Sequence, residues 1–165
     1  MSAGARLAIR PADSADAGRL LGWANDPATR AASFDREPIA PAAHEAWLAA
    51  LLGDPARRLW IAEEAGVPVG QVRVDRAADG VGVVSIGLAP GVRGRGLGRA
   101  ILRLALGSAA AELGIRRARA VVRRSNVPSR RLFEGAGFRA VARPAGEAGH
   151  PDALVLEALV PVPGR

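Results

Sequence analysis

A turn rich in glycine and arginine carries the clearest chemistry in this sequence. It covers residues 90–99 and contains Arg93, Gly94, Arg95, Gly96, Gly98 and Arg99. An apolar run typical of a strand precedes it, and a long apolar segment typical of a helix follows it. Glycine lets a ligand approach the backbone closely, and the start of a helix offers unpaired N–H groups and a positive dipole end. The turn therefore predicts a binding site for phosphate groups.

Two other phosphate-binding loops do not fit this turn. The dinucleotide fingerprint needs a third glycine three positions after the second, where this chain has Arg99. A P-loop needs a lysine at the start of its helix, and the chain contains no lysine. A glycine-rich surface turn before a core helix is the remaining alternative when the turn is considered alone.

A second motif follows one helix and one strand later, over residues 121–138. It contains a strand end, Asn126, a short helix, and then Gly137 and Phe138. Taken locally, Asn126 is an ordinary helix N-cap and Gly137 an ordinary helix stop. These local roles do not explain why the block lies at this separation from the first turn.

The spacing Arg93-x-x-Gly96-x-Gly98 and the downstream block together resemble the GCN5-related N-acetyltransferase (GNAT) superfamily over residues 81–138. The resemblance implies acetyl-CoA as cosubstrate, with its pantetheine arm on the strand at 86–88 and its diphosphate on backbone N–H groups of residues 94–99. It also implies that Asn126 binds the pantetheine or diphosphate portion and that Arg131 reaches the ribose phosphate. The implied cofactor-binding residues are Ile86, Gly87, Leu88, Arg93, Gly94, Arg95, Gly96, Leu97, Gly98, Arg99, Asn126 and Arg131.

The chain departs from these relatives at the positions of the usual acid and base. Many relatives have a tyrosine seven residues after the asparagine, where this chain has Phe133, and the chain contains no tyrosine. Some relatives have a glutamate five residues before the asparagine, where this chain has Val121. The attacking amine must still lose its proton, to a side chain or through ordered water. The candidates for this base are His44, Glu63 and Glu64, of which one at most serves.

The N-terminal third indicates the acceptor. Residues 23–30, with His44-Glu45-Ala46-Trp47 further on, look like a branch of the superfamily that acetylates amino-sugar nucleotides. A neighbouring branch that acetylates the N-termini of ribosomal proteins has a similar tryptophan–asparagine–aspartate segment. We therefore expect acetyl transfer to a primary amine, with an amino-sugar nucleotide favoured. The alternatives are an N-terminal acetyltransferase of a ribosomal protein and a non-catalytic acyl-CoA-binding module.

Composition narrows the class of protein. At 165 residues, of which 49% are hydrophobic, the chain fits one domain over residues 1–165, and the resemblance implies that it is an N-acetyltransferase domain. Because cysteine is absent, disulfides and thiolate metal sites are excluded. The two histidines, His44 and His150, lie far apart, and no apolar run approaches the roughly 20 residues of a membrane span. A cytoplasmic protein without a metal is expected.

Charge is distributed unevenly along the chain. The formal net charge is +7, and residues 93–143 hold thirteen arginines and two glutamates, which gives +11 there and −4 elsewhere. A basic half beside an acidic half suits a protein that binds a polyanion such as coenzyme A on one side. Nucleic acid is the rival polyanion, but only 4% of residues are aromatic and no recognition motif is present. We expect a small-molecule amine acceptor, no nucleic acid or membrane partner, and a monomer or homodimer.

The order of the expected elements gives the fold class. Hydrophobic patterns predict strands over residues 6–10, 58–64, 69–75, 81–89, 118–123, 138–141 and 154–160. Helices are predicted over residues 13–23, 28–33, 41–52, 96–113 and 127–134, and a loop over 144–151. The expected fold is α/β: a GNAT-like mixed, mostly antiparallel sheet with helices on both faces and, from the resemblance, a splayed central strand.

Overall fold

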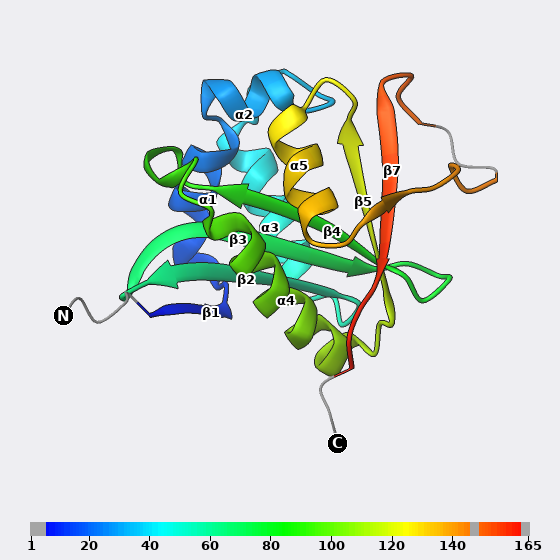
Figure 1. Cartoon of the computed structure of the whole chain (residues 1–165). Coiled ribbons are helices and arrows are strands. Elements are labelled where there is room, and N and C mark those ends of the chain that lie inside the picture. Colours follow the sequence, from blue (N-terminus) through cyan, green and yellow to red (C-terminus); the bar gives the residue numbers. More distant parts are fainter. Residues whose placement is uncertain (1–5, 146–148, 163–165) are drawn as a thin grey trace.

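The structure is a computed structural model that describes residues 6–145 and 149–162 (Figure 1). Its centre is a seven-stranded sheet with the strand order β1-β2-β3-β4-β5-β7-β6. Neighbouring strands are antiparallel except β4 and β5, which run parallel. The strands are β1 (Leu7–Pro11), β2 (Arg57–Glu64), β3 (Val67–Arg76), β4 (Gly82–Leu88), β5 (Arg117–Arg123), β6 (Arg139–Ala140) and β7 (Ala153–Leu159).

Helices cover both faces of this sheet. They are α1 (Ala17–Ala24), α2 (Pro27–Ala32), α3 (Pro41–Leu52), α4 (Leu97–Leu113) and α5 (Val127–Gly135), with the short 3-10 helices η1 (Ser14–Asp16) and η2 (Pro90–Val92). Helix α4 crosses one face, and α1 and α3 lie on the other (Figure 1). The expected fold class is thus confirmed. No helix in the described part of the chain has the length and apolar character needed to cross a membrane.

Strand β2 shows how the two faces are formed. Successive side chains of a strand point to opposite sides. Trp60 and Ala62 belong to the main apolar core beneath α4, whereas Leu59 and Ile61 pack with α1 and α3. All four are at most 4% exposed, so β2 is buried on both sides.

The sheet is split between β4 and β5. Only two residue pairs join these strands, Gly82 with Ala118 and Val83 with Arg119. A Cβ atom on Gly82 would lie 2.5 Å from Cδ1 of Ile115 and 2.9 Å from Cγ1 of Val74, so glycine lets these two side chains pack closely over the start of β4. Beyond the two residue pairs the strands diverge, and α2 and α5 lie toward the open end (Figure 1). This is the splayed central strand that the resemblance implied.

Three predicted elements differ from the observed ones. The predicted helix over residues 13–23 begins as η1, because Asp13 and Asp16 form a capping box there, and continues as α1. The predicted strand over residues 69–75 begins earlier, at Val67, because the turn before it is only two residues long and its residues, Ala65 and Gly66, both adopt positive φ angles, 51° and 80°. The predicted strand over 138–141 shortens to β6. Of the predicted loop over 144–151, residues 146–148 lie outside the described residues.

Candidate active site

A cavity of about 220 Å³ lies in the split between β4 and β5. Both strands contribute to its wall, as do the start of α5 and the segment that follows α2. The lining residues are Ala32, Ser33, Phe34, Val84, Ser85, Ile86, Val121, Val122, Arg123, Asn126, Ser129 and Phe133. The cavity is therefore bounded by residues far apart in sequence, from Ala32 to Phe133, and it is the candidate active site.

Strand β4 presents a free backbone edge to the split. Its partner on the other side is β3, where the Ala89 N–H donates to the Val69 carbonyl at 2.8 Å. Hydrogen-bonded pairs alternate along an antiparallel ladder, so Gly87 also bonds toward β3. The N–H and C=O groups of Ile86 and Leu88 consequently face the split. The register thus distinguishes Ile86 and Leu88, whose backbone groups can reach a ligand there, from Gly87, whose groups serve the ladder with Gln71.

The glycine-rich turn begins α4 without a side-chain cap. Gly94 and Gly96 both have φ of +78°, a left-handed conformation that side chains with a Cβ rarely adopt. Gly96 occupies the N-cap position and provides no side-chain cap for the first turn of α4. The N–H groups that follow Gly96 are therefore available to an anion.

Gly98, the last glycine of the turn, has a packing role. A Cβ atom on Gly98 would lie 2.8 Å from Cδ1 of Leu132, so glycine lets α4 and α5 approach closely. The Arg99 guanidinium lies over Gly135, at the end of α5. Arg131 precedes Gly135 by four residues, which places both on the same side of α5. Neither Arg99 nor Arg131 has a carboxylate partner among residues 6–145 and 149–162, so their charges are available to a ligand.

The other two arginines of the turn hold tertiary contacts. Arg93 donates from Nη1 to Asp26 Oδ2 at 3.0 Å and from Nη2 to Thr29 Oγ1 at 2.9 Å. Arg95 donates to both carboxylate oxygens of Glu64 at 2.9 Å. The hydrogen bond from Arg93 lowers the pKa of Asp26, and the one to Glu64 raises the pKa of Arg95. These side chains attach the turn to neighbouring elements.

Asn126 caps α5 beside the cavity. Its Oδ1 accepts a hydrogen bond from the Ser129 N–H at 3.2 Å. Its Nδ2 has no protein partner in the described part of the chain. Phe133, at the position where relatives have a tyrosine, is 2% exposed and packs edge-on against Phe138, with 5.1 Å between ring centroids. The Asn126 amide is therefore a hydrogen-bond donor at the cavity. Phe133 gives the cavity an aromatic wall at the position where many relatives have a tyrosine, whose phenol can act as an acid.

None of the three candidate bases lines the cavity. His44 lies on α3, is 5% exposed and contacts Trp47, and its burial lowers its pKa. Glu63 accepts a hydrogen bond from Arg10 Nε at 2.8 Å. Glu64 is held by Arg95, as described above. The assignment of a base among these residues stays a prediction.

Sequence reasoning missed a cluster at the open end of the split. Arg123 donates from Nε to Asp152 Oδ2 at 3.0 Å, and this contact and the hydrogen bond from Ser125 lower the pKa of Asp152. The Asp152 N–H donates to His150 Nδ1 at 3.1 Å, and the His150 ring lies 5.3 Å from that of Phe34. These residues come from three distant segments, and no spacing in the sequence links them.

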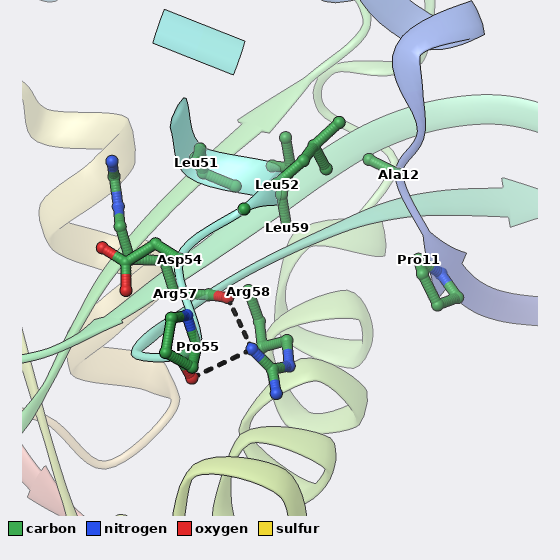
Figure 2. Close-up of a pocket in the computed structure, with 10 residues that line it drawn as sticks. Pro11, Ala12, Leu51, Leu52, Asp54, Pro55, Arg57, Arg58 and Leu59 are labelled. Atoms are coloured by element: carbon green, nitrogen blue, oxygen red, sulfur yellow. Dashed lines mark hydrogen bonds between the residues drawn. The ribbon is translucent and has the colours of Figure 1, made fainter. Parts of the chain in front are cut away.

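A larger cavity, of about 380 Å³, lies at the start of β2, beside the end of α3 (Figure 2). Its arginines are already paired, Arg57 with Asp75 and Arg58 with Glu112. Arg58 also donates to the carbonyl groups of Pro55 and Arg57, as the dashed lines in Figure 2 show. Asp54 Oδ1 accepts a hydrogen bond from the Ala56 N–H at 2.9 Å, and the other lining residues are apolar. Within the described residues, no group of three His, Asp or Glu side chains could hold a metal ion.

The sequence matches the acetyltransferase (GNAT) domain family over residues 6–139. The chain therefore belongs to this family and is an acetyltransferase. No curated protein matches the sequence significantly.

Solved structures share the fold. A spermidine N-acetyltransferase from Vibrio cholerae, in complex with CoA and spermine, has a TM-score of 0.81 at 20% identity, covering 93% of this chain and 95% of that chain. A Salmonella typhimurium protein with its cofactor acetyl-CoA has a TM-score of 0.73 at 24% identity, covering 94% of each chain. An aminoglycoside acetyltransferase in complex with coenzyme A has a TM-score of 0.77 at 19% identity, covering 93% and 95%.

Proposed function

We propose that this protein transfers the acetyl group of acetyl-CoA to the primary amine of a small, hydroxyl-bearing acceptor. The observation that carries the proposal is the split sheet, in which the free backbone edge of β4 runs from the cavity to the uncapped start of α4. The structures solved with CoA or acetyl-CoA on this fold support the choice of cosubstrate. The alternative of a binding module without catalysis is an outcome of the experiment below.

Each part of the cosubstrate has a matching group on the chain. The N–H groups that follow Gly96 bind the diphosphate. The free edge at Ile86 and Leu88 pairs with the amides of the pantetheine arm, as an added strand would. Arg99 and Arg131 attract the ribose phosphate, because two positive side chains without carboxylate partners favour a bound anion. The bound molecule supplies the thioester that is attacked.

The reaction needs few groups from the protein. The amine nitrogen bonds to the carbonyl carbon, the carbon–sulfur bond breaks, the thiolate leaves, and the amine proton passes to water. A thiol of pKa about 8.5 is a tolerable leaving group, so a strong acid is not obligatory. A free N–H on the edge of β4, that of Ile86 or of Leu88, stabilises the oxyanion, and donors of this kind contribute about 3 kcal/mol. Holding amine and thioester together in the cavity contributes several kcal/mol more.

The absence of tyrosine gives this mechanism a distinctive pH profile. We expect the rate to rise with one apparent pKa, that of the amine or of its base, without a fall near pH 10, which is about the pKa of tyrosine. Initial rates of thiol release between pH 6 and pH 10.5, corrected for unfolding, measure this profile. A fall near pH 10 would require an acid that this proposal lacks.

The lining of the cavity indicates the class of acceptor. Its polar side chains are Ser33, Ser85, Arg123, Asn126 and Ser129, and none of its lining residues is a carboxylate. Hydroxyl and amide groups hydrogen-bond a sugar well, whereas a polyamine needs anionic partners. We therefore infer an amino-sugar nucleotide in preference to a polyamine. Arg30 does not contribute, because it donates to the carbonyl groups of Ala24, Asp35 and Glu37.

A thiol-release assay with fixed acetyl-CoA tests the proposal. The panel contains a nucleotide-linked amino sugar, a peptide with a free N-terminus, an aminoglycoside and spermidine. We expect the amino sugar to give the highest kcat/KM and spermidine the lowest. Highest activity on the peptide would favour an N-terminal acetyltransferase. Binding of acetyl-CoA by calorimetry without thiol release for any amine would favour the non-catalytic module.

A further inference from the structure

Helix α2 is held at both ends by arginines, one from each side of the split. Arg93 follows β4 and contacts the start of α2, whereas Arg123 ends β5 and contacts the residue after α2. Strands β4 and β5 share only two residue pairs, both at the closed end. Helix α2 therefore forms a second connection between them, at the open end.

The contact at the start of α2 is made of three linked hydrogen bonds. Asp26 caps α2 by accepting from the Thr29 N–H at 3.3 Å. The same Asp26 oxygen accepts from Arg93 Nη1, and the Thr29 hydroxyl accepts from Arg93 Nη2. The Asp26 side chain is 18% exposed, so this ion pair is partly shielded from water. Arg93 thus fixes the helix cap and the first turn together.

The contact at the other end is more deeply placed. Arg123, whose side chain is 13% exposed, donates from Nη1 to the Ser33 carbonyl at 3.1 Å while its Nε donates to Asp152. Ala32, Ser33 and Phe34 form one wall of the cavity. The position of this wall therefore depends on both arginines.

We propose that Arg93 is a positioning residue for the acceptor side of the cavity, acting through α2, rather than a ligand of the diphosphate. The proposal rests on the proposed function, since it assigns the cavity beside Ser33 and Phe34 to the amine. Because the guanidinium of Arg93 is committed to Asp26 and Thr29, the turn binds phosphate through its backbone while its first arginine sets the opposite wall. Arg93 and Arg123 together hold α2 across the split.

Arg93→Gln tests this assignment, with Arg131→Gln as the matched control. For Arg93→Gln we expect the Kd for acetyl-CoA, measured by calorimetry, to change less than about twofold, while amide exchange in residues 29–34 accelerates at least about tenfold. The KM for the panel amine with the highest wild-type kcat/KM should rise about fivefold or more, with little change in kcat. Arg131→Gln should show the reverse: weaker acetyl-CoA binding and unchanged exchange in α2.

Two results would overturn the proposal: a tenfold or greater loss of acetyl-CoA affinity in Arg93→Gln, or unchanged exchange in residues 29–34. Asp26→Asn gives a second test, because asparagine still caps a helix but loses the ion pair. It should reproduce the amine KM effect and leave acetyl-CoA affinity intact. Failure of the proposed function is recognised separately, since the wild-type enzyme would then release no thiol with any amine, whereas the exchange and affinity measurements need no acceptor.

Discussion

The glycine-rich turn and the N-terminal helical segment, residues 13–37, are positioned by opposite means. The turn is shaped by backbone conformation, with positive φ at Gly94 and Gly96 and a close helix contact at Gly98. The N-terminal segment is held by charged side chains from elsewhere: Arg10 contacts Asp16, Arg93 contacts Asp26, and Arg123 contacts the Ser33 carbonyl. The two regions meet at the cavity and should be sensitive to different kinds of substitution.

This difference predicts which substitutions each region tolerates. The diphosphate site at Gly94 and Gly96 should be sensitive to an added Cβ and little affected by loss of the charge on Arg93 or Arg95, because its ligand contacts are N–H groups. A region held by ion pairs should be sensitive to loss of charge and to acid. Four substitutions test this contrast, in order of decreasing effect.

Gly96→Val should cause the largest effect. Valine at φ of +78° is strained by about 1–2 kcal/mol or more, and relief of that strain moves the N–H groups that begin α4. We expect acetyl-CoA affinity to fall at least about tenfold, measured by calorimetry and by the loss of the ligand-induced rise in Tm. Gly107→Val is the control, because Gly107 lies in the same helix in open space. Equal affinity in both variants would contradict the backbone-built site.

Asp16→Asn should reduce stability by about 2 kcal/mol at pH 7. Asp16 is 1% exposed, and hydrogen bonds from Arg10 lower its pKa from 3.8 to about 2. A lowered pKa stabilises the fold above the unfolded value of 3.8, and this contribution is lost as pH falls toward 2. In urea unfolding, the difference between wild type and variant should therefore shrink below about pH 4.

Asp13→Asn provides the control for this measurement. Asp13 lies in the same capping box but is exposed, and asparagine accepts the same N–H hydrogen bond. Its cost should be less than about 0.5 kcal/mol. A difference between wild type and Asp16→Asn that stays constant from pH 7 to pH 2.5 would mean that Asp16 acts by packing rather than by charge.

Gly98→Ala should have a smaller effect, visible as coupling to Leu132. The added Cβ would lie 2.8 Å from Leu132 Cδ1. Gly98→Ala should therefore lower the free energy of unfolding by about 1 kcal/mol more in the wild type than in the Leu132→Ala variant, where that clash is absent. Gly107→Ala, in open space, should instead stabilise the protein by about 0.5–1 kcal/mol through helix propensity. Urea unfolding of the wild type, the two single variants and the double variant measures this coupling. If the two changes in the free energy of unfolding add, Gly98 has no packing role against Leu132.

Glu64→Gln should have the smallest effect. Its bidentate partner Arg95 is exposed, and exposed ion pairs contribute little. We expect kcat/KM to change less than about twofold, and the same for Glu63→Gln and His44→Gln, because none of the three lines the cavity. A fall of about 10²–10⁴ in one of them, with unchanged acetyl-CoA affinity, would identify it as the base.

The glycine-rich turn could be predicted because its determinants are local. A left-handed residue at the start of a helix requires glycine, so the spacing of Gly94 and Gly96 itself encodes the backbone path. The same is true of Asn126, whose capping role follows from its place before α5. The fold class followed from the order of strand and helix patterns.

The acceptor side could not be predicted in the same way. Arg93 and Asp26 are 67 residues apart, and Arg123 and Ser33 are 90 apart. With 23 arginines in the chain, nothing in the sequence specifies which one meets which carboxylate. The resemblance gives Arg93 only as one of the cofactor-binding residues, and no spacing in the sequence predicts that its guanidinium contacts Asp26 and Thr29.

The two-pair junction between β4 and β5 also bears on how the molecule unfolds. It divides the sheet into two ladders, β1 to β4 and β5 to β7, which share an apolar core but little backbone hydrogen bonding. The ion pair of Arg119 with Asp79, in the turn between β3 and β4, connects the ladders beside this junction, and Arg119 also pairs with Glu157 within the second ladder. Cooperativity between the ladders therefore depends on the α4 core and on this charge cluster. Weakening either the α4 core or the charge cluster should replace the single unfolding transition of the protein with two, one for each ladder.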